Sequence, residues 1–487
     1  MNALACLLAA LLLSVGHGEA KAHDIFQTVP ELIQDEGYPV EVHHVETADG
    51  YVLELHRIPQ TAGRRRPGSA VLLMHGLQDS SAAWVINPRR SLGFMLADQG
   101  YDVWLGNNRG NRYSRKHVRL SPDSRQFWQF TADDYARYDN PAIIDYILHV
   151  TGYEDLFYIG FSASTWSFWA MMNHDPSYNS KVRLMVGLGP VATMKYWRSI
   201  TRLAVPFSGA LVHTADKLGI YESLPYNTLY GNLGKVFCSK HSPTVLLCAL
   251  GIFLLAGWDP KQLDKASLPQ IFAHVPAGVG TRVERQFAQH ISSGRFQRFD
   301  YGKKRNLAIY GQRKPPLYFP ELVTVPVVLM WGKNDKMADK RDVAALAARL
   351  PNLVSSRPVA WPLWQHLDFL WGIDAHRLVY QRILQRLHQF SSRAPREYIG
   401  RSSVVYSGDG NDTSATYPSD DAANPCASGV DNAPTVSTRT CQVCGTNATY
   451  LLVGEGSPDA GAPLLCPGCD AGSAPRLTRL DMALTPQ

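Results

Sequence analysis

Ser162 lies in the segment GFSAS at 160–164, directly after an apolar run. Residues 156–159 are typical of a buried strand, and residues 165–172 could form a buried helix. A sharp strand-to-helix turn of this kind exposes a serine hydroxyl, and the start of the helix offers N–H groups to a developing oxyanion. Ser162 is therefore a candidate nucleophile. The usual G-x-S-x-G pattern of such a turn is incomplete, because its final position is Ser164.

A nucleophilic serine needs a base and an acid that orients the base, and suitable residues follow two later strands. Residues 325–331 are a continuous apolar run that predicts a strand, and Asp335 follows its carboxyl end. Residues 354–361 predict the last strand, and His366 follows it. The order serine, acid, histidine is the one that this type of turn uses. The sequence thus predicts a catalytic triad of Ser162, Asp335 and His366. The alternatives for the acid are Asp339 and Asp342.

An oxyanion intermediate needs backbone N–H donors close to the nucleophile. Residues 70–74 predict a strand that leads into His75 and Gly76, which places the N–H of Leu77 beside the serine. The second donor is the N–H of Ala163, the residue after the nucleophile. We therefore predict an oxyanion hole of Leu77 and Ala163, and we give His75 a structural role in its loop. A site of this kind transfers an acyl group to water and needs no cofactor.

The elements that would position these residues alternate between strands and helices. Apolar runs typical of strands covered on both faces occur at 70–74, 103–105, 156–159, 184–188 and 325–331. Helical patterns lie between them, as at 142–150 and 343–350, and two shorter strand patterns precede them at 40–45 and 51–58. This order predicts an α/β fold with a mostly parallel sheet flanked by helices.

Composition divides the chain into five predicted parts. They are a signal peptide at 1–22, the first part of the α/β core at 23–189, a helical cap and lid at 190–320, the second part of the core at 321–397, and a tail at 398–487. The cap is predicted because its segment is rich in leucine and aromatic residues and lacks a strand rhythm. The tail is rich in small and polar residues, which predicts low complexity and disorder.

The N-terminal segment and the charge balance restrict where the protein acts and what it binds. The apolar run at 3–15 is too short to span a bilayer, and small residues suited to signal peptidase follow it, so we expect secretion without a transmembrane anchor. The sequons at Asn411 and Asn447 predict glycosylation. A net charge of +6 is modest, and no basic run with interleaved aromatic residues suggests nucleic-acid binding.

The cysteines fall into two groups. Cys238 and Cys248 are close in sequence and could form a disulfide. The tail holds the others that follow the signal segment, namely Cys426, Cys441, Cys444, Cys466 and Cys469. The last four form two C-x-x-C pairs whose spacing is close to that of a four-cysteine zinc site. An oxidising compartment favours disulfides instead, and both interpretations stay open.

Dense motifs between roughly residues 23 and 386 resemble the acid lipases, a family that includes gastric and lysosomal lipases. They are VETADGY at 45–51, MHGL at 74–77, DVWLGNNRGN at 102–111, HVPAG at 274–278, FQRFD at 296–300, NDKMAD at 334–339 and HLDF at 366–369. The resemblance implies an α/β-hydrolase core, a helical cap with a lid, and a disulfide in the cap. It also implies hydrolysis of triacylglycerols or cholesteryl esters at a lipid–water interface, in a secreted or lysosomal protein. It supports the triad and the oxyanion donors named above.

The turn around the nucleophile departs from the pattern of the family, which is Gly-His-Ser-Gln-Gly. Phe161, Ala163 and Ser164 occupy the histidine, glutamine and final glycine positions. A displaced N–H at residue 163 would remove an oxyanion donor, and such a loss lowers turnover by about 10²–10³-fold. Two alternatives to a lipase therefore remain, a catalytically impaired lipid-binding homologue and an esterase for small soluble esters.

Overall fold

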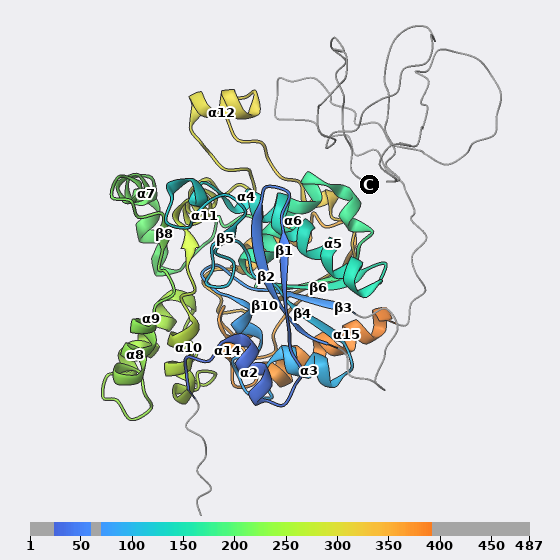
Figure 1. The fold of residues 1–487 in the computed structure, drawn as a ribbon, viewed down its shortest axis with the longest axis vertical. Helices are drawn as coiled ribbons and strands as arrows, with labels where there is room; N and C mark the ends of the chain where they lie inside the picture. The colour runs from blue at the N-terminus through green and yellow to red at the C-terminus, as the bar shows by residue number, and fades with distance from the viewer. Residues whose placement is uncertain (1–23, 60–69, 392–487) are drawn as a thin grey trace, which may run out of the picture. The chain divides into compact units, whose positions relative to one another are not determined.

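A computed structural model describes residues 24–59 and 70–391 of the chain. Its centre is a sheet with the strand order β1-β2-β4-β3-β6-β7-β10-β11, and the short strand β5 pairs with β2 (Figure 1). The strands are β1 (Glu41–Glu46), β2 (Tyr51–Ile58), β3 (Ala70–Met74), β4 (Asp102–Leu105), β5 (Lys116–His117), β6 (Leu156–Phe161), β7 (Val182–Leu188), β10 (Val327–Trp331) and β11 (Leu353–Pro358).

The sheet is mostly parallel. The strands β4, β3, β6, β7, β10 and β11 run parallel to one another, whereas β2 pairs antiparallel with both β1 and β4. Along β3, Leu72 and Met74 belong to one buried cluster, while Val71 and Leu73 belong to another. Both faces of the sheet are therefore covered, which explains the continuous apolar runs in the sequence. The predicted α/β fold is confirmed.

Helices cover the two faces of the sheet. Those whose buried residues join the first cluster include α5 (Asn140–Thr151), α6 (Ala163–His174) and α13 (Lys340–Ala347). Those that join the second cluster include α2 (Val29–Asp35), α3 (Leu92–Asp98), α14 (Asp368–Trp371) and α15 (Gln381–Ser391). Short helical turns complete the core: η1 (Ser81–Trp84), η2 (Arg125–Trp128), α4 (Ala132–Asp134), η3 (Tyr135–Asp139), η4 (Pro176–Asn179), η7 (Pro320–Leu322) and η8 (His376–Tyr380).

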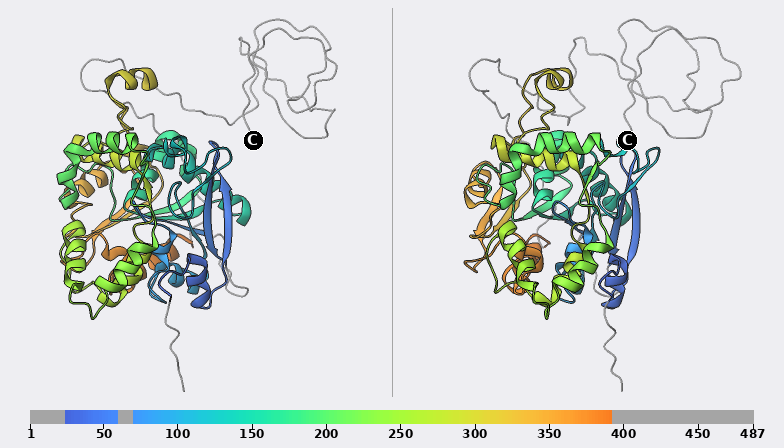
Figure 2. Two further views of the ribbon diagram at one scale, coloured as in Figure 1. Left: turned by 60° about the vertical axis from the view of Figure 1, so that its left-hand side comes forward. Right: turned by 90° about the vertical axis from the view of Figure 1, so that its left-hand side faces the viewer.

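The segment at 190–320 is largely helical and interrupts the sheet between β7 and β10. It holds η5 (Ile200–Phe207), α7 (Ser208–Lys217), β8 (Glu222–Ser223), α8 (Thr228–Phe237), α9 (Val245–Ala256), η6 (Lys265–Ser267), α10 (Leu268–His274), β9 (Val279–Gly280), α11 (Thr281–Ser293) and α12 (Lys303–Tyr310). Helices α7 to α10 gather at one side, and the β1–β2 hairpin, which forms one edge of the sheet, lies at the opposite side (Figure 2). We call this segment the cap. Within it, Cys238 and Cys248 form the disulfide that the sequence suggested.

Several predictions concern parts of the chain that lie outside the described residues. These are the signal peptide, the two sequons, and the disulfide or zinc site of the tail cysteines. Within residues 24–59 and 70–391, no helix has both the length and the apolar character needed to cross a membrane. The apolar helix α9 has only 12 residues and buries one face, formed by Val245, Ala249, Ile252, Phe253 and Ala256.

Candidate active site

Ser162 occupies a sharp turn between β6 and α6. Its backbone has φ 53° and ψ −116°, a region that a non-glycine residue rarely adopts and that costs about 1–3 kcal/mol. The Ser162 N–H donates to the carbonyl of Leu188 on β7 at 2.9 Å, and its own carbonyl accepts from the N–H and hydroxyl of Thr165 at 2.9 and 2.6 Å. These bonds hold the strained conformation, which is typical of a nucleophile elbow.

The three predicted triad residues lie in one hydrogen-bonded chain. His366 Nε2 is 2.7 Å from Ser162 Oγ, and His366 Nδ1 is 2.8 Å from Asp335 Oδ2. His366 and Asp335 are buried, with 2% and 0% of their surface exposed. Asp335 Oδ1 accepts the N–H groups of Met337 and Ala338, each at 2.7 Å. The acid thus keeps its other oxygen for Nδ1–H, and this tautomer leaves Nε2 free to accept the serine proton.

The two alternative acids have other partners. Asp339 caps α13 by accepting the N–H of Arg341, and it forms ion pairs with Arg341 and Arg198. Asp342 accepts the N–H of Tyr196 at 2.9 Å, at the start of the cap. Neither side chain contacts His366 among these interactions. Asp335 is therefore the acid that the fold places beside the imidazole.

The two predicted oxyanion donors flank Ser162. A Cβ atom added to Gly76 would lie 2.9 Å from the Phe161 ring and 3.4 Å from Ser162 Cβ, so the turn that carries Leu77 packs directly on the elbow. Within the described part of the chain, neither the Leu77 N–H nor the Ala163 N–H donates a hydrogen bond. Both donors are therefore available to a substrate oxygen.

His75 holds the loop that carries Leu77. Its Nδ1 lies 2.7 Å from the Gly76 carbonyl, and its Nε2 accepts the N–H of Asn108 at 3.2 Å. Burial lowers the pKa of His75 to about 4, so the ring is neutral near pH 7. With both ring nitrogens occupied by the protein, His75 has a structural part in this geometry.

The unusual neighbours of Ser162 fit the elbow through contacts of their own. The buried Ser164 hydroxyl lies 2.8 Å from the Met74 carbonyl of β3 and 2.9 Å from the Phe161 carbonyl. A Cβ atom at Gly160 would come within 3.0 Å of this hydroxyl, so the glycine makes room for it. The Phe161 ring packs on the imidazole of His366, with ring centres 4.9 Å apart. The turn therefore accommodates Phe161 and Ser164 without displacing the triad.

No role was predicted for Gln365 and Asp368, which stand on either side of His366. Asp368 accepts hydrogen bonds from both the backbone and the side chain of Gln365. The motif HLDF contains Asp368, but only the folded structure shows what the carboxyl group holds.

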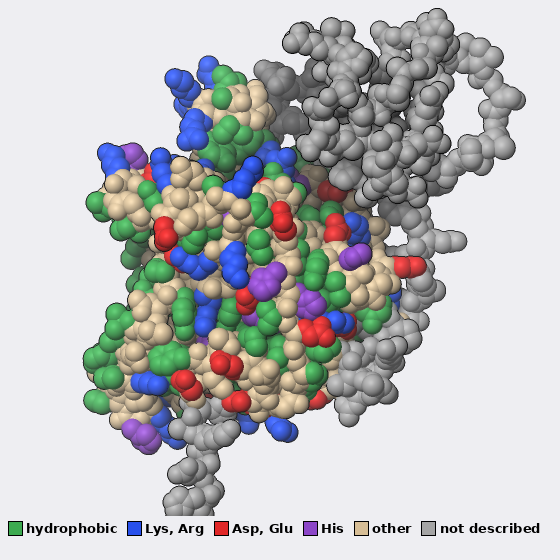
Figure 3. Space-filling model, in the orientation of Figure 1, with side chains coloured by type: hydrophobic (Ala, Val, Ile, Leu, Met, Phe, Trp, Pro, Cys, Tyr) green, Lys and Arg blue, Asp and Glu red, His purple; other side chains and the backbone are tan. Residues whose placement is uncertain are grey.

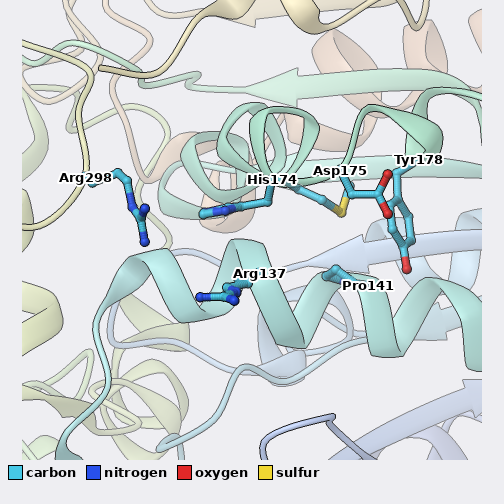
Figure 4. A pocket seen from close by; sticks show the side chains of 7 residues that line it. Arg137, Pro141, His174, Asp175, Tyr178 and Arg298 are labelled. Carbon is cyan, nitrogen blue, oxygen red and sulfur yellow. The ribbon is translucent and has the colours of Figure 1, made fainter. Parts of the chain in front are cut away.

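A cavity of about 390 Å³ lies at the far end of α6 from the nucleophile (Figure 4). It is lined by Arg137, Pro141, Met171, His174, Asp175, Tyr178 and Arg298. Helix α6 begins beside Ser162 and ends at His174, which separates the two sites by about 18 Å at 1.5 Å per residue. The pKa of His174 is lowered to about 4, by burial and by the charges of Arg298 and Arg137. No triad residue lines this cavity.

Among the described residues, no cluster of His, Cys, Asp and Glu could hold a metal ion.

Known proteins resemble this chain over most of its described length. Residues 29–88 match the partial α/β-hydrolase lipase region, and residues 69–373 match the α/β hydrolase fold. The chain is 40% identical to Lipase 3 of Drosophila melanogaster, over 74% of this chain and 92% of that protein. It is 38% identical to gastric triacylglycerol lipase of Bos taurus, over 75% and 92% of the two chains. It is 36% identical to a Crotalus adamanteus protein named as a lysosomal acid lipase/cholesteryl ester hydrolase, over 74% and 90%. The chain therefore belongs to the acid lipase family of α/β hydrolases.

Proposed function

We propose that this protein is a lipase that hydrolyses carboxylic esters of fatty acids, such as triacylglycerols or cholesteryl esters. The observation that carries the proposal is the chain of hydrogen bonds from Ser162 through His366 to Asp335, with distances of 2.7 and 2.8 Å. The names of the similar lipases support the substrate class. A lipid-binding protein without catalysis would have no need of a strained serine aligned with a buried imidazole and acid.

The proposed reaction transfers an acyl group first to Ser162 and then to water. His366 Nε2 takes the hydroxyl proton as Ser162 Oγ attacks the ester carbonyl, and the Asp335 carboxylate stabilises the imidazolium. When the tetrahedral intermediate collapses, the imidazolium gives its proton to the departing alcohol, and an acyl-enzyme remains. A water molecule then gives a proton to His366 and attacks the acyl carbon. The fatty acid leaves as Ser162 recovers its proton.

The N–H groups of Leu77 and Ala163 are the proposed donors to the oxyanion. Both flank the nucleophile and neither has another acceptor among the described residues. The Ala163 N–H also belongs to the first turn of α6, where the helix dipole favours negative charge. Because these donors are backbone groups, the absence of a glutamine side chain at position 163 does not remove them.

The cap offers a surface that suits contact with lipid. Its helices expose large hydrophobic side chains that a soluble surface rarely gathers in one place. They include Leu203, Phe207, Leu211 and Leu218 around η5 and α7, Leu229, Val236 and Phe237 on α8, and Leu246, Leu247, Leu250 and Leu254 on α9. Figure 3 shows hydrophobic side chains gathered along the edge formed by α7, α8 and α9. We therefore propose that the enzyme binds its substrate at a lipid–water interface through the cap.

The location that we propose for the protein is the extracellular space or the lysosomal lumen. The predicted signal peptide supports entry into the secretory pathway, and the Cys238–Cys248 disulfide suits an oxidising compartment. The names of the gastric and lysosomal relatives agree with this proposal.

Hydrolysis assays on two kinds of ester test the proposed function. Wild type and Ser162→Ala are compared on a soluble short-chain ester and on a long-chain triacylglycerol emulsion. The proposal predicts that wild type hydrolyses both and that Ser162→Ala hydrolyses neither. Equal residual rates in the two proteins would support a lipid-binding homologue. Hydrolysis of the short ester alone would support an esterase for soluble substrates.

A further inference from the structure

Two buried carboxyl groups join the cap to the loop that carries His366. Asp259 follows α9 in the cap, and Asp368 is the first residue of α14, two residues after His366. They are 0% and 2% exposed, and their carboxyl groups lie within hydrogen-bonding reach of each other. An ionised carboxylate can only accept hydrogen bonds, so a hydrogen bond between them requires a proton on one of the two groups.

The Asp368 carboxyl group fixes the backbone around the catalytic histidine. Its Oδ2 accepts the N–H of Gln365 at 2.8 Å, and its Oδ1 accepts the side-chain amide of Gln365 at 2.5 Å. The Gln365 side chain in turn accepts the N–H of Leu367 at 2.8 Å. The residues before and after His366 are thus held by one network, and the position of Asp368 sets the position of the imidazole.

Asp259 holds Asp368 from the side of the cap. Its Oδ2 accepts the indole N–H of Trp361 at 2.7 Å, from the segment that leads to His366. The backbone N–H groups of Lys261 and Gln262 approach this carboxyl group and lower its pKa, but the buried Oδ1 has no hydrogen bond of ordinary geometry from a described N–H or hydroxyl group. A carboxyl O–H on Asp368 supplies the donor that this oxygen lacks, and this gives the pair one proton between two carboxyl groups.

The segment before Asp259 lies against both loops of the triad. A Cβ atom at Gly257 would clash with the Asn334 carbonyl and would lie 2.7 Å from Gln365 Cβ, so only glycine fits there. The Lys336 N–H also donates to the Ala256 carbonyl at 3.1 Å. A shift of this part of the cap would therefore move the residues next to both Asp335 and His366.

We propose that Asp259 is a positioning residue for ester hydrolysis, which holds the His366 loop through a proton shared with Asp368 and so makes turnover fall as pH rises. This inference rests on the proposed function. Once the shared proton is lost, two buried carboxylates repel each other, and the contact between the cap and the loop opens. Burial raises the pKa of Asp368 well above its usual range, and the charge of Asp259 raises it further. Burial also raises the pKa of Asp259.

The other charged groups on the surrounding elements have partners of their own. Asp335 binds His366, the Lys336 ammonium donates to the Phe253 carbonyl, Lys261 lies over the Trp361 ring, Asp374 binds Gln262 and Arg377, and His376 contacts the Ile373 carbonyl. None of these contacts supplies a cation to Asp259 or Asp368. The repulsion between the two carboxylates is thus not offset from a neighbouring element.

The first test compares the pH dependence of turnover in wild type and Asp259→Asn, with a soluble short-chain ester so that the lipid interface has no influence. The amide that this substitution introduces can donate to an ionised Asp368 and still accept from Trp361, so the link no longer needs a proton. We expect the fall in kcat at high pH to move upward by about one pH unit or more in this variant, with little change in KM. Asp368→Asn is the second variant: its amide can donate to Asp259 but offers one acceptor to the two Gln365 donors, so kcat should be lower than in wild type while its high-pH fall moves in the same direction.

Asp133→Asn is the matched control. Asp133 is another buried carboxyl group, its pKa is raised to about 6 by burial, and it binds Gln286 and Tyr318 instead of the triad loops. The high-pH fall in kcat should be the same in this variant as in wild type. An unshifted fall in both Asp259→Asn and Asp368→Asn would overturn the proposal, as would an equal shift in Asp133→Asn.

A second readout does not depend on catalysis. Infrared spectra at the pH of maximal turnover should contain the C=O band of one protonated carboxyl group that is missing from Asp259→Asn. Because the folded-state pKa of Asp368 lies above its unfolded value, the folded protein holds an extra proton. Wild-type stability should therefore decrease as pH rises from the unfolded to the folded pKa, and the decrease should be smaller in Asp259→Asn. A wild type without esterase activity would contradict the proposed function, while the infrared band would still decide whether the pair shares a proton.

Discussion

The active site and the outer surface of the cap differ in how well their side chains are matched to their surroundings. Each polar atom of the Ser162, His366 and Asp335 side chains has a partner, and His366 and Asp335 are almost fully buried. On the cap, Leu203 and Leu247 are 74% and 66% exposed. The first region satisfies its contacts within the chain, and the second leaves an apolar surface without a partner among the described residues.

This difference suggests that the two regions have separate functions, one in ester hydrolysis and the other in lipid binding. The proposed triad and backbone donors would act on any ester carbonyl that reaches them. The apolar surface of the cap has no part in that chemistry, but it can bring the enzyme to an aggregated lipid. Changes in the core should therefore affect hydrolysis of every ester, whereas changes on the cap should affect only substrates in emulsions.

The largest effect is expected from Asp335→Asn. The amide stabilises the wrong histidine tautomer, and a comparable change in a serine protease lowers kcat by about 10⁴-fold. The loss should be equal for soluble and emulsified esters, measured as kcat on each. Asp342→Asn is the control, because Asp342 was an alternative acid and instead binds the start of the cap. A large loss in Asp342→Asn with an active Asp335→Asn would show that the acid is wrongly assigned.

An intermediate effect is expected from changing Leu246 and Leu247 together to serine. Both lie on α9 and are 62% and 66% exposed, so their replacement should not alter the packing of the core. Burying one leucine contributes about 1.5–3 kcal/mol, so loss of two should weaken binding to an emulsion by more than about tenfold. Activity on a soluble short-chain ester should stay the same. Val118→Ser, a change at an exposed site outside the cap, is the control and should leave both activities intact. Equal losses on both substrates would argue against a separate lipid-binding surface.

The smallest effect is expected from Ser164→Gly, which restores the usual glycine of the elbow. The change removes the hydrogen bond to the Met74 carbonyl and adds a glycine to α6, so unfolding should become easier by about 1–2 kcal/mol. Turnover should stay within about fivefold of wild type, since the triad distances do not depend on this hydroxyl. Ser164→Ala removes the hydrogen bond without adding a glycine, and so separates these two contributions to the free energy of unfolding. A large gain in kcat for Ser164→Gly would show that the present elbow is impaired.

The strands, and the residues proposed as the triad, could be identified in the sequence because their signals are local. Apolar runs identify β6 and β10, and the proposed nucleophile and acid follow them; His366 follows the less apolar β11. Contacts between distant segments gave no such signal. The hydroxyl of Ser164 contacts the carbonyl of Met74, 90 positions earlier in the chain. The Asp259 carboxyl group of the cap lies close to that of Asp368 in the core. A residue type predicts a possible role, but only the fold decides which partner it meets.

The most direct test of the central claim is to label the nucleophile covalently. An alkyl phosphonate ester, which reacts with an activated serine and mimics the tetrahedral intermediate, is added to wild type, Ser162→Ala and His366→Ala. Peptide mass spectrometry then locates the adduct. The proposed mechanism predicts one stoichiometric adduct on Ser162 in wild type, none in Ser162→Ala, and strongly slowed labelling in His366→Ala. Labelling of another serine with loss of activity, or equal labelling rates in wild type and His366→Ala, would contradict it.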